Sequence, residues 1–199
     1  PEHHAVEGFN LVQAERPCIV EILGTIQQWD EALLFWANSL FPSSTDTFWQ
    51  AATKTISWAP LYVVLLARII RSADSHSTWL FRIALVILGV LLWDQGATLA
   101  KSLIARPRPC HEFSELRVLA QCAPFGMFSA HAANSFGLAF LVRKWVHPSW
   151  FPILLLTAAI QSFSRLNLGV HYPSDLLVGA LFGILVARLL NQLDAKFNE

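Results

Sequence analysis

The sequence has few charged residues for its length. Only 14% of its 199 residues are Asp, Glu, Lys or Arg, whereas a soluble domain usually carries about 25%. The formal net charge is zero, so the chain has no basic or acidic excess of the kind that attracts nucleic acid. Hydrophobic residues make up 54% of the chain. A large soluble helical core is the alternative, but the apolar runs are too long and too many for it, and they favour a membrane protein.

Tyrosine is scarce among the aromatic residues, and a secretory signal is missing. Two Tyr stand against eight Trp and fourteen Phe, and Trp near helix ends is typical of anchoring at a membrane interface. The first sixteen residues are polar, with no charged start followed by an apolar stretch. We therefore expect membrane insertion to come from internal segments.

Several internal segments are long and apolar enough to be compared with a membrane span, which needs about 20 residues. They are residues 49–70, 78–103, 130–146, 150–166 and 173–193. Residues 17–40 are amphipathic instead, and their acids Glu21, Asp30 and Glu31 argue against a span. An interfacial helix or a packed partial span is expected there.

The pattern as a whole predicts an all-α fold, an integral membrane helical bundle with about five to six transmembrane helices and an N-terminal amphipathic helix. Residues 1–16 are expected to form a polar tail. Residues 17–199 are expected to form a single membrane-embedded domain, because no internal repeat or low-complexity tract divides them.

Three polar stretches interrupt the apolar pattern. They are KSLIARPRP (101–109), FSAH (128–131) and SRLNLGVHYPSD (164–175). If the spans alternate in direction, four span ends lie on one side of the membrane, here called side P. They are the end of the second span, the start of the third, the end of the fourth and the start of the fifth. All three stretches then meet there. Lys101, Arg108 and Arg165 would gather three cations, and Arg in particular matches the oxygens of a phosphate.

Two histidines in these stretches could perform chemistry on a bound phosphate. His171 and Asp175 are four residues apart, so they meet on one face if a helix begins near Tyr172. An Asp that accepts from one imidazole nitrogen orients the other as a nucleophile or base. His131 then remains to protonate a leaving oxygen. Ser129 is expected to cap the third span, whose free backbone N–H groups favour an anion.

The order and spacing of these residues resemble the type 2 phosphatidic acid phosphatase (PAP2) superfamily, whose signature is K-x6-RP, then PSGH, then SR-x5-H-x3-D. The first and third elements are complete in 101–109 and 164–175. The second departs, because Phe128 replaces the Pro and Ala130 replaces the Gly, while Ser129 and His131 match. The resemblance implies a helical core like that of the haloperoxidases in the same superfamily.

The resemblance also implies a mechanism. His171 would attack phosphorus and form a phosphohistidine that water later hydrolyses, Asp175 would orient it, and His131 would act as general acid. The groups expected to hold the phosphoryl oxygens are Lys101, Arg108, Ser129, the Ala130 amide and Arg165. No metal or other cofactor is implied, because three cations take the place of a metal.

The function predicted in this way is hydrolysis of a lipid phosphate monoester or pyrophosphate by an integral membrane phosphatase. Phosphatidylglycerol phosphate, phosphatidate, undecaprenyl pyrophosphate and lipid A phosphate all remain open as substrates. The alternatives are a lipid-linked phosphotransferase and a non-catalytic protein that binds or transports a lipid phosphate. The partners expected are the lipid phosphate and the bilayer, with no nucleic acid, and the sequence leaves the oligomeric state open.

The distribution of positive charge predicts an orientation. Side P carries six cations, and three of them are assigned to phosphate. The opposite side carries Arg68, Arg71, Arg82, Arg143, Lys144, Arg188 and Lys196. Without the phosphate-binding cations, side P has three cations and the opposite side has seven. This difference predicts that the opposite side is cytoplasmic. The protein is thus expected in a bacterial inner membrane, with its active site facing the periplasm.

Side chains outside the motifs receive structural interpretations. Cys110 and Cys122 lie in the loop on side P, where oxidation is permitted, and are predicted to form a disulfide. Arg106 and Arg117 are interpreted as ordinary loop charges, with contact to substrate headgroups as the alternative. Asp94 is expected to form a structural hydrogen bond within the bundle rather than to relay protons.

Gly179 and Gly183 form a small-xxx-small pair on the last span. Such a pair lets helix backbones approach closely in a membrane, although simple tolerance of Gly explains it equally well.

Overall fold

The computed structural model describes the backbone of residues 16–199 and the side chains of residues 21–199. Apart from one isolated β-bridge between Pro107 and Phe125, the regular structure in this part of the chain is helical. The long elements are α2 (Arg16–Ser39), α4 (Ala59–Arg71), α5 (His76–Ile104), α7 (Ala130–Val142), α8 (Trp150–Asn167) and α9 (Pro173–Phe197). The short ones are η1 (Ser43–Thr45), α3 (Asp46–Ala52), η2 (Thr55–Trp58) and α6 (Pro109–Glu112).

These elements confirm the predicted all-α class. The polar tail predicted for residues 1–16 lies outside the described residues, except for Arg16, which begins α2.

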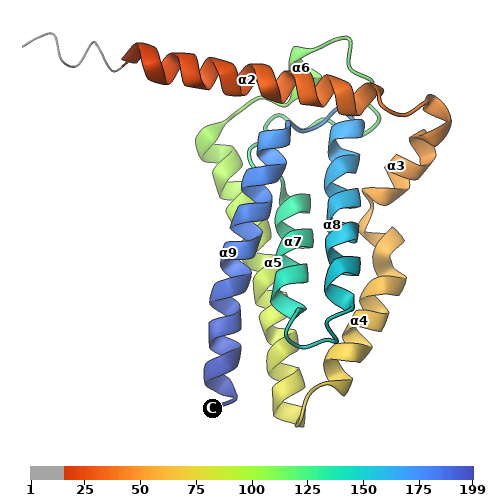
Figure 1. Ribbon diagram of the computed structural model, residues 1–199, viewed down its shortest axis with the longest axis vertical. Helices are drawn as coiled ribbons and strands as arrows, with labels where there is room; N and C mark the ends of the chain where they lie inside the picture. The colour runs from red at the N-terminus through yellow and green to blue at the C-terminus, as the bar shows by residue number, and fades with distance from the viewer. Residues whose placement is uncertain (1–15) are drawn as a thin grey trace, which may run out of the picture.

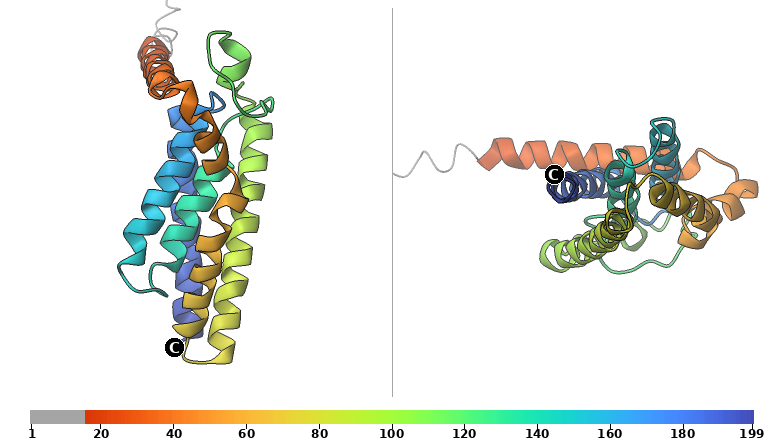
Figure 2. Two further views of the ribbon diagram at one scale, coloured as in Figure 1. Left: turned by 90° about the vertical axis from the view of Figure 1, so that its right-hand side faces the viewer. Right: turned by 90° about the horizontal axis from the view of Figure 1, so that it is seen from below.

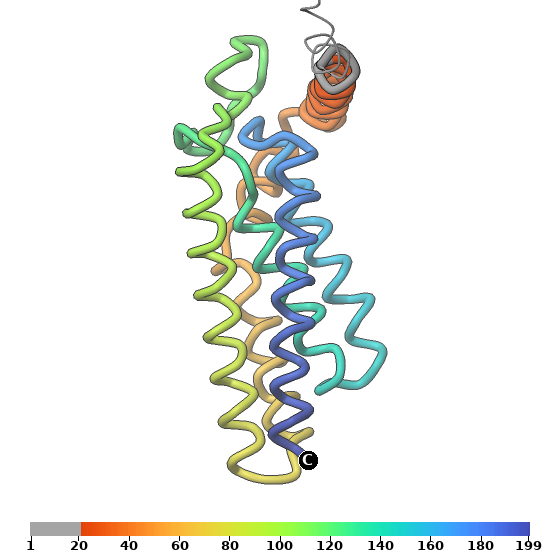
Figure 3. The backbone as a smooth tube through the Cα atoms, turned by 90° about the vertical axis from the view of Figure 1, so that its left-hand side faces the viewer, coloured from red at the N-terminus to blue at the C-terminus, as the bar shows by residue number. Residues whose placement is uncertain are grey.

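The long helices form an elongated bundle with α2 lying across one end (Figure 1). Helices α5, α8 and α9 run along the bundle, α7 lies among them, and the C-terminus lies at the end away from α2 (Figures 1 and 2). The loop between α5 and α7 lies at the same end as α2 (Figure 3). This crossing orientation of α2 agrees with the interfacial alternative of the sequence analysis rather than with a partial span.

Helix α7 packs closely on α9, and two glycines make this possible. A Cβ atom on Gly183 would lie 2.2 Å from the carbonyl oxygen of Ala133, and one on Gly179 would lie 2.5 Å from that of Ser129. No side chain fits at such distances, so the close-approach interpretation of the glycine pair is confirmed. The contact also fixes the start of α7 against the start of α9.

The centre of the bundle is filled by Trp93 of α5, whose side chain is fully buried. Its indole lies against Gly89 of the same helix and Gly137 of α7, where a Cβ atom would come within 2.8 and 2.4 Å of the ring. The outer surface is also apolar. On α9, for example, the exposed large apolar side chains are Leu177, Leu181, Leu185, Leu189, Leu193 and Phe197, which repeat every four residues and so form a stripe that winds along the helix.

Helices α5 and α9 are each long and apolar enough to cross a membrane, and the bent pair Ser43–Ala52 and Thr55–Arg71 makes a third if it counts as one span. Helix α7 is apolar but only 13 residues long.

The expectation of one continuous span over 49–70 is wrong. The chain bends by 75° between α3 and α4, and Lys54 at the break is extended. Pro60 explains why one helix cannot run through, because it lacks the N–H that would bond to the Ile56 carbonyl and its ring would clash with that group. It lies instead in the first turn of α4, where Pro is tolerated.

Candidate active site

The three polar stretches meet at the end of the bundle that α2 covers. Lys101 lies in the last turn of α5, Arg165 lies in the last turn of α8, and Ser129 precedes α7. His171 lies just before α9, and α9 begins at the same end (Figure 3). The alternation of the helices therefore brings these residues together, as the sequence analysis required.

His171 and Asp175 form a buried pair. The Nδ1 atom of His171 lies 3.1 Å from Oδ2 of Asp175, and the two side chains are 2% and 0% exposed. The same carboxylate oxygen accepts a hydrogen bond of 3.1 Å from the backbone N–H of Tyr172. Pro173 begins α9 directly afterwards and sets the helical spacing that brings the pair together. Because Nδ1 is engaged, Nε2 is the ring nitrogen available for attack.

Burial also determines the charge of His171. It lowers the pKa of the imidazole to about 4, and the nearby Arg108 and Arg165 act in the same direction, while Asp175 acts against them. The ring is therefore neutral near pH 7, which is the state that a nucleophile needs.

Arg108 and Arg165 lie near this pair, and they line an open cleft of about 550 Å³ that neither His171 nor Asp175 lines. The side chain of Arg108 donates from Nε to the Phe125 carbonyl at 3.0 Å, and Arg165 donates from Nη1 to Thr53 Oγ1 at 2.7 Å. Both residues are more than nine-tenths buried. The cleft thus has positive walls, and these bonds hold each guanidinium in a fixed orientation.

His131 lines a second cavity of about 510 Å³ between α4, α5, α7 and α8. Most of its wall is apolar, with Leu65, Val86 and Leu138 among the lining residues. Arg165, His171 and Lys101 all lie within electrostatic reach of the His131 ring. His131 therefore stands between the positively charged centre and an apolar space inside the bundle.

Ser129 does not cap α7 with its side chain, contrary to expectation. It occupies the N-cap position, but its side chain makes no cap bond, and its backbone N–H donates to the Asp175 carbonyl at 3.0 Å. Among the described residues its buried Oγ has no hydrogen-bond partner, nor does Nε of Arg165. Buried donors without partners are costly, so both atoms are suited to meet the oxygens of a bound phosphate.

The two departures in the second motif have different structural effects. Phe128 is 5% exposed and packs on Phe182 with ring centroids 4.8 Å apart. Ala130 begins α7 and keeps its backbone N–H, which is one of the free donors at a helix start. Phe128 thus packs inside the protein, and Ala130 still offers its amide as a donor.

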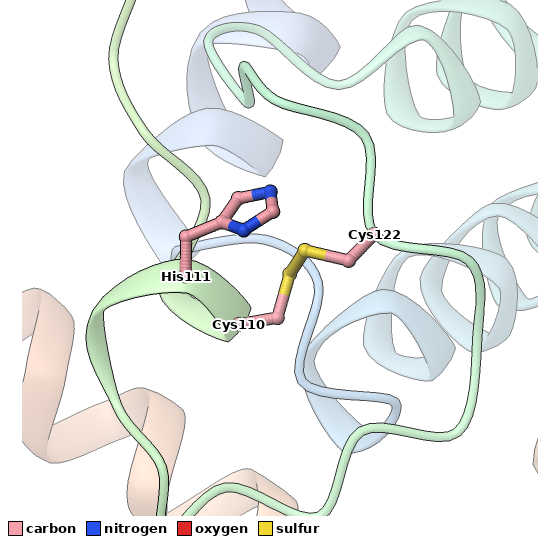
Figure 4. Close-up of side chains that lie close together, drawn as sticks. All are labelled: Cys110, His111 and Cys122. Atoms are coloured by element: carbon pink, nitrogen blue, oxygen red, sulfur yellow. A yellow bond between two sulfur atoms is a disulfide. The ribbon is translucent and has the colours of Figure 1, made fainter.

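The loop at this end contains a disulfide between Cys110 and Cys122 (Figure 4), whose Cα atoms are 6.4 Å apart. In the chain-entropy model, closing a loop of this size stabilises the fold by about 3 kcal/mol. His111 lies beside the disulfide, and its Nε2 is 3.3 Å from the Ala123 carbonyl oxygen. These three side chains lie close enough together to hold a metal, but two sulfurs bonded to each other are not thiolate ligands.

The interpretation of Arg106 and Arg117 as ordinary loop charges is wrong. Arg106 forms ion pairs with Asp30 at 2.8 Å and Asp175 at 3.3 Å, and Arg117 forms one with Asp46 at 3.1 Å. Neither lines the two cavities described above. The sequence did not predict the ion pair of Arg106 with Asp30, although an acid within an amphipathic helix indicates that a partner is needed.

Asp94 behaves as expected. Its Oδ1 accepts a hydrogen bond of 2.7 Å from Nδ2 of Asn134 on α7, so the acid links two helices of the bundle.

Comparison with known proteins gives a family and a fold. Residues 78–199 match the model of the PAP2 superfamily. A lipid A 4′-phosphatase of Bacteroides thetaiotaomicron is 29% identical over 172 residues, which cover 83% of this chain and 75% of the relative. A decaprenylphosphoryl-5-phosphoribose phosphatase of Mycobacterium tuberculosis is 32% identical over 95 residues, about half of each chain (48% and 51%).

Two crystal structures share the fold. Aquifex aeolicus LpxE superposes with a TM-score of 0.68 at 22% identity, over 81% of this chain and 93% of that one. A transmembrane PAP2-type phosphatidylglycerolphosphate phosphatase from Bacillus subtilis gives 0.64 at 22% identity, over 86% and 87%.

Proposed function

This chain belongs to the PAP2 superfamily, its relatives include lipid phosphatases, and we propose that it hydrolyses a lipid phosphate through a phosphohistidine intermediate. The observation that carries the proposal is the buried contact of 3.1 Å between His171 and Asp175 near Arg108 and Arg165, which line the positive cleft. A neutral, oriented imidazole next to fixed cations is what attack on a phosphate ester requires.

The reaction proceeds in two displacements. Nε2 of His171 attacks phosphorus while the bond from phosphorus to the lipid oxygen breaks, and His131 gives its proton to that leaving oxygen. Asp175 stabilises the positive charge that develops on the His171 ring. Water then attacks the phosphohistidine, His131 takes up a proton from this water, and inorganic phosphate leaves with His171 neutral again.

The phosphoryl oxygens are held by cations and neutral donors. Arg108, Arg165 and Lys101 supply the positive charge that stabilises the transition state. Ser129 Oγ and the Ala130 amide add donors at the start of α7, where the helix dipole also favours an anion. These groups stabilise the charge that a metal ion stabilises in metal-dependent phosphatases.

The apolar cavity beside His131 supports a lipid leaving group. In an in-line displacement the leaving oxygen lies opposite the attacking Nε2, and we place it at His131, whose ring lies within electrostatic reach of His171. A hydrocarbon chain attached to that oxygen finds the apolar wall between α4, α5 and α7. Relatives named as lipid A 4′-phosphatases make a lipid A phosphate the first substrate to test, followed by phosphatidylglycerol phosphate, phosphatidate and undecaprenyl pyrophosphate.

The proposed location is the bacterial inner membrane, with the site open to the periplasm. The excess of cations away from the site supports this orientation, and a disulfide in the loop at the site end suits an oxidising compartment.

The test uses the purified protein in detergent with each of these lipids. We expect the unmodified protein to release inorganic phosphate, which also separates hydrolysis from transfer to another acceptor. Substitution His171→Ala should abolish release, and a lipid labelled in its phosphate should label the unmodified protein but not this variant. His147→Ala, at the opposite end of the bundle, is the matched control and should remain active. Phosphate release by the His171→Ala protein would refute the mechanism.

A further inference from the structure

Asp175 makes contacts with both of its carboxylate oxygens. Oδ2 accepts from the Tyr172 backbone and contacts His171, as described above. Oδ1 lies 3.3 Å from Nη1 of Arg106, which comes from the loop after α5. The Asp175 side chain is 0% exposed. Arg106 contacts its Oδ1 atom, whereas the imidazole contacts its Oδ2 atom.

The guanidinium of Arg106 is held by hydrogen bonds along its edges and by an aromatic ring against its face. Nη1 also donates to Ser174 Oγ at 2.7 Å, while Nη2 donates to Asp30 Oδ2 at 2.8 Å and to Gln27 Oε1 at 2.9 Å. The centre of the guanidinium lies 3.9 Å from the centroid of the Tyr172 ring. A planar guanidinium bound in this way has a single orientation, which Lys could not reproduce.

Asp30 reaches the same place from α2, 76 residues earlier in the chain than Arg106. It is 4% exposed and accepts a hydrogen bond of 2.8 Å from the backbone N–H of Ser174 and another from its hydroxyl. Ser174 lies in the first turn of α9, where backbone N–H groups lack partners within the helix. Asp30 therefore caps α9 from a different helix.

The charges explain why these groups belong together. Asp30 and Asp175 are both buried carboxylates, and one guanidinium contacts both. Removing one member of a buried ion pair leaves an uncompensated charge, which is strongly destabilising for the remaining group. Without Arg106, the Asp175 carboxylate loses the contact that fixes its Oδ1 atom and is free to turn, which changes how it holds His171.

We propose that Arg106 and Asp30 are positioning residues that hold Asp175 aimed at His171, so that the docking of α2 completes the catalytic centre. The proposal rests on the proposed function. It assigns Arg106 to the acid that orients the nucleophile and not to the substrate, because both terminal nitrogens of its guanidinium are already bonded to protein oxygens. Helix α2 thereby acts on the reaction through Arg106 and Asp175.

The kinetic test compares Arg106→Gln, Arg106→Lys and Asp30→Asn with the unmodified protein in mixed micelles of detergent and substrate. Loss of the outer partner of a metal-ligating residue costs about 10- to 100-fold in activity, and we expect a comparable loss in kcat here. KM and inhibition by inorganic phosphate should stay unchanged, because Arg108, Arg165 and Lys101 are not altered. Arg106→Lys should recover part of kcat. The double variant of Asp30 and Arg106 should lose less than the product of the single losses.

Arg117→Gln is the matched control. Arg117 comes from the same loop, forms an ion pair with Asp46, and donates to the carbonyls of Asn38 and Phe41 at the end of α2. It therefore ties the same region together without touching Asp175. We expect its kcat to equal that of the unmodified protein. Unchanged kcat in Arg106→Gln, or an equal loss in Arg117→Gln, would overturn the proposal.

A second measurement does not depend on turnover. Titration of His171, followed by NMR of protein labelled in its histidines, should shift its midpoint in Arg106→Gln and Asp30→Asn but not in Arg117→Gln. Unchanged midpoints in the first two variants would overturn the positioning role. If the proposed function fails, the unmodified protein releases no phosphate from any lipid, while this titration still reports whether Arg106 acts on the pair of His171 and Asp175.

Discussion

The two histidines of the site have different surroundings, and the surroundings predict different roles. His171 is 1% exposed and touches a carboxylate, which suits a neutral nucleophile held in one orientation. His131 is only partly buried and lines the apolar cavity, which places it beside the leaving group. A general acid matters most when the leaving oxygen is strongly basic.

Substitution His131→Ala should therefore depend on the substrate. For a phosphate on an alkyl or sugar oxygen, we expect kcat/KM, which reports formation of the phosphohistidine, to fall by about 10²- to 10⁴-fold, the usual contribution of a general acid. For an aryl phosphate whose leaving group needs no proton, the loss in kcat/KM should be much smaller. The measurement is kcat/KM for both substrate types in both proteins. Equal losses would show that His131 does not donate the proton.

On the scale of whole helices, the contact between α7 and α9 positions the site. It joins the helix start that carries Ser129 and His131 to the helix start that carries Asp175, and the glycines of α9 set the separation. Backbone atoms cannot move aside in the way that a flexible side chain can. A side chain placed at this contact must therefore push the two helix starts apart.

Substitution Gly183→Ala should lower both stability and activity. Its Cβ atom would lie 2.2 Å from the Ala133 carbonyl oxygen, and overpacking of this kind typically costs about 1–3 kcal/mol. Gly24→Ala on α2 is the control, since nothing lies within 4 Å of the new atom and Ala in a helix gains about 0.5–1 kcal/mol over Gly. Thermal unfolding, followed by Trp fluorescence, gives the stability of both variants, and phosphate release gives their activity. A Gly183→Ala protein as stable as the unmodified one would contradict the close contact.

As a whole, the molecule has two unlike ends. The end covered by α2 holds the site, the disulfide and the ion pairs of Arg106, whereas the opposite end holds the turns between α4 and α5 and between α7 and α8, and the C-terminus (Figure 1). The apolar stripe of α9 runs between them. Such a molecule fits a bilayer with the site near one surface.

The proposed orientation predicts the location of the C-terminus. A green fluorescent protein fused after Glu199 should fluoresce in a bacterial host, because the C-terminus lies on the side with more cations, which is expected to be cytoplasmic. An alkaline phosphatase fused there should be inactive, because that enzyme needs the oxidising periplasm to form its disulfides. The same two fusions after Glu115, in the loop between α5 and α7, keep α5 and the helices before it, and they serve as the control that should give the reverse pattern. A fluorescent fusion at Glu115 together with an active phosphatase at Glu199 would reverse the orientation.

Local patterns in the sequence determined the helices and the residues of the motifs. Apolar runs and their boundaries predicted α5, α7, α8 and α9 closely, because a helix depends mainly on neighbours a few residues away. The spacing of His171 and Asp175 is equally local, since one turn of a helix brings the pair together. The alternation of spans was enough to predict that three polar stretches share one end.

Only the tertiary structure decided the contacts between distant segments. The ion pairs of Arg106 join residues 76 and 69 positions apart, and no local pattern encodes which loop cation meets which buried acid. The break near Lys54 likewise depends on how α3 packs against α8 and α4 against α5, although Pro60 gave a local warning. Burial and partner choice arise when helices pack together, because a charge needs a counter-charge only once water has been excluded.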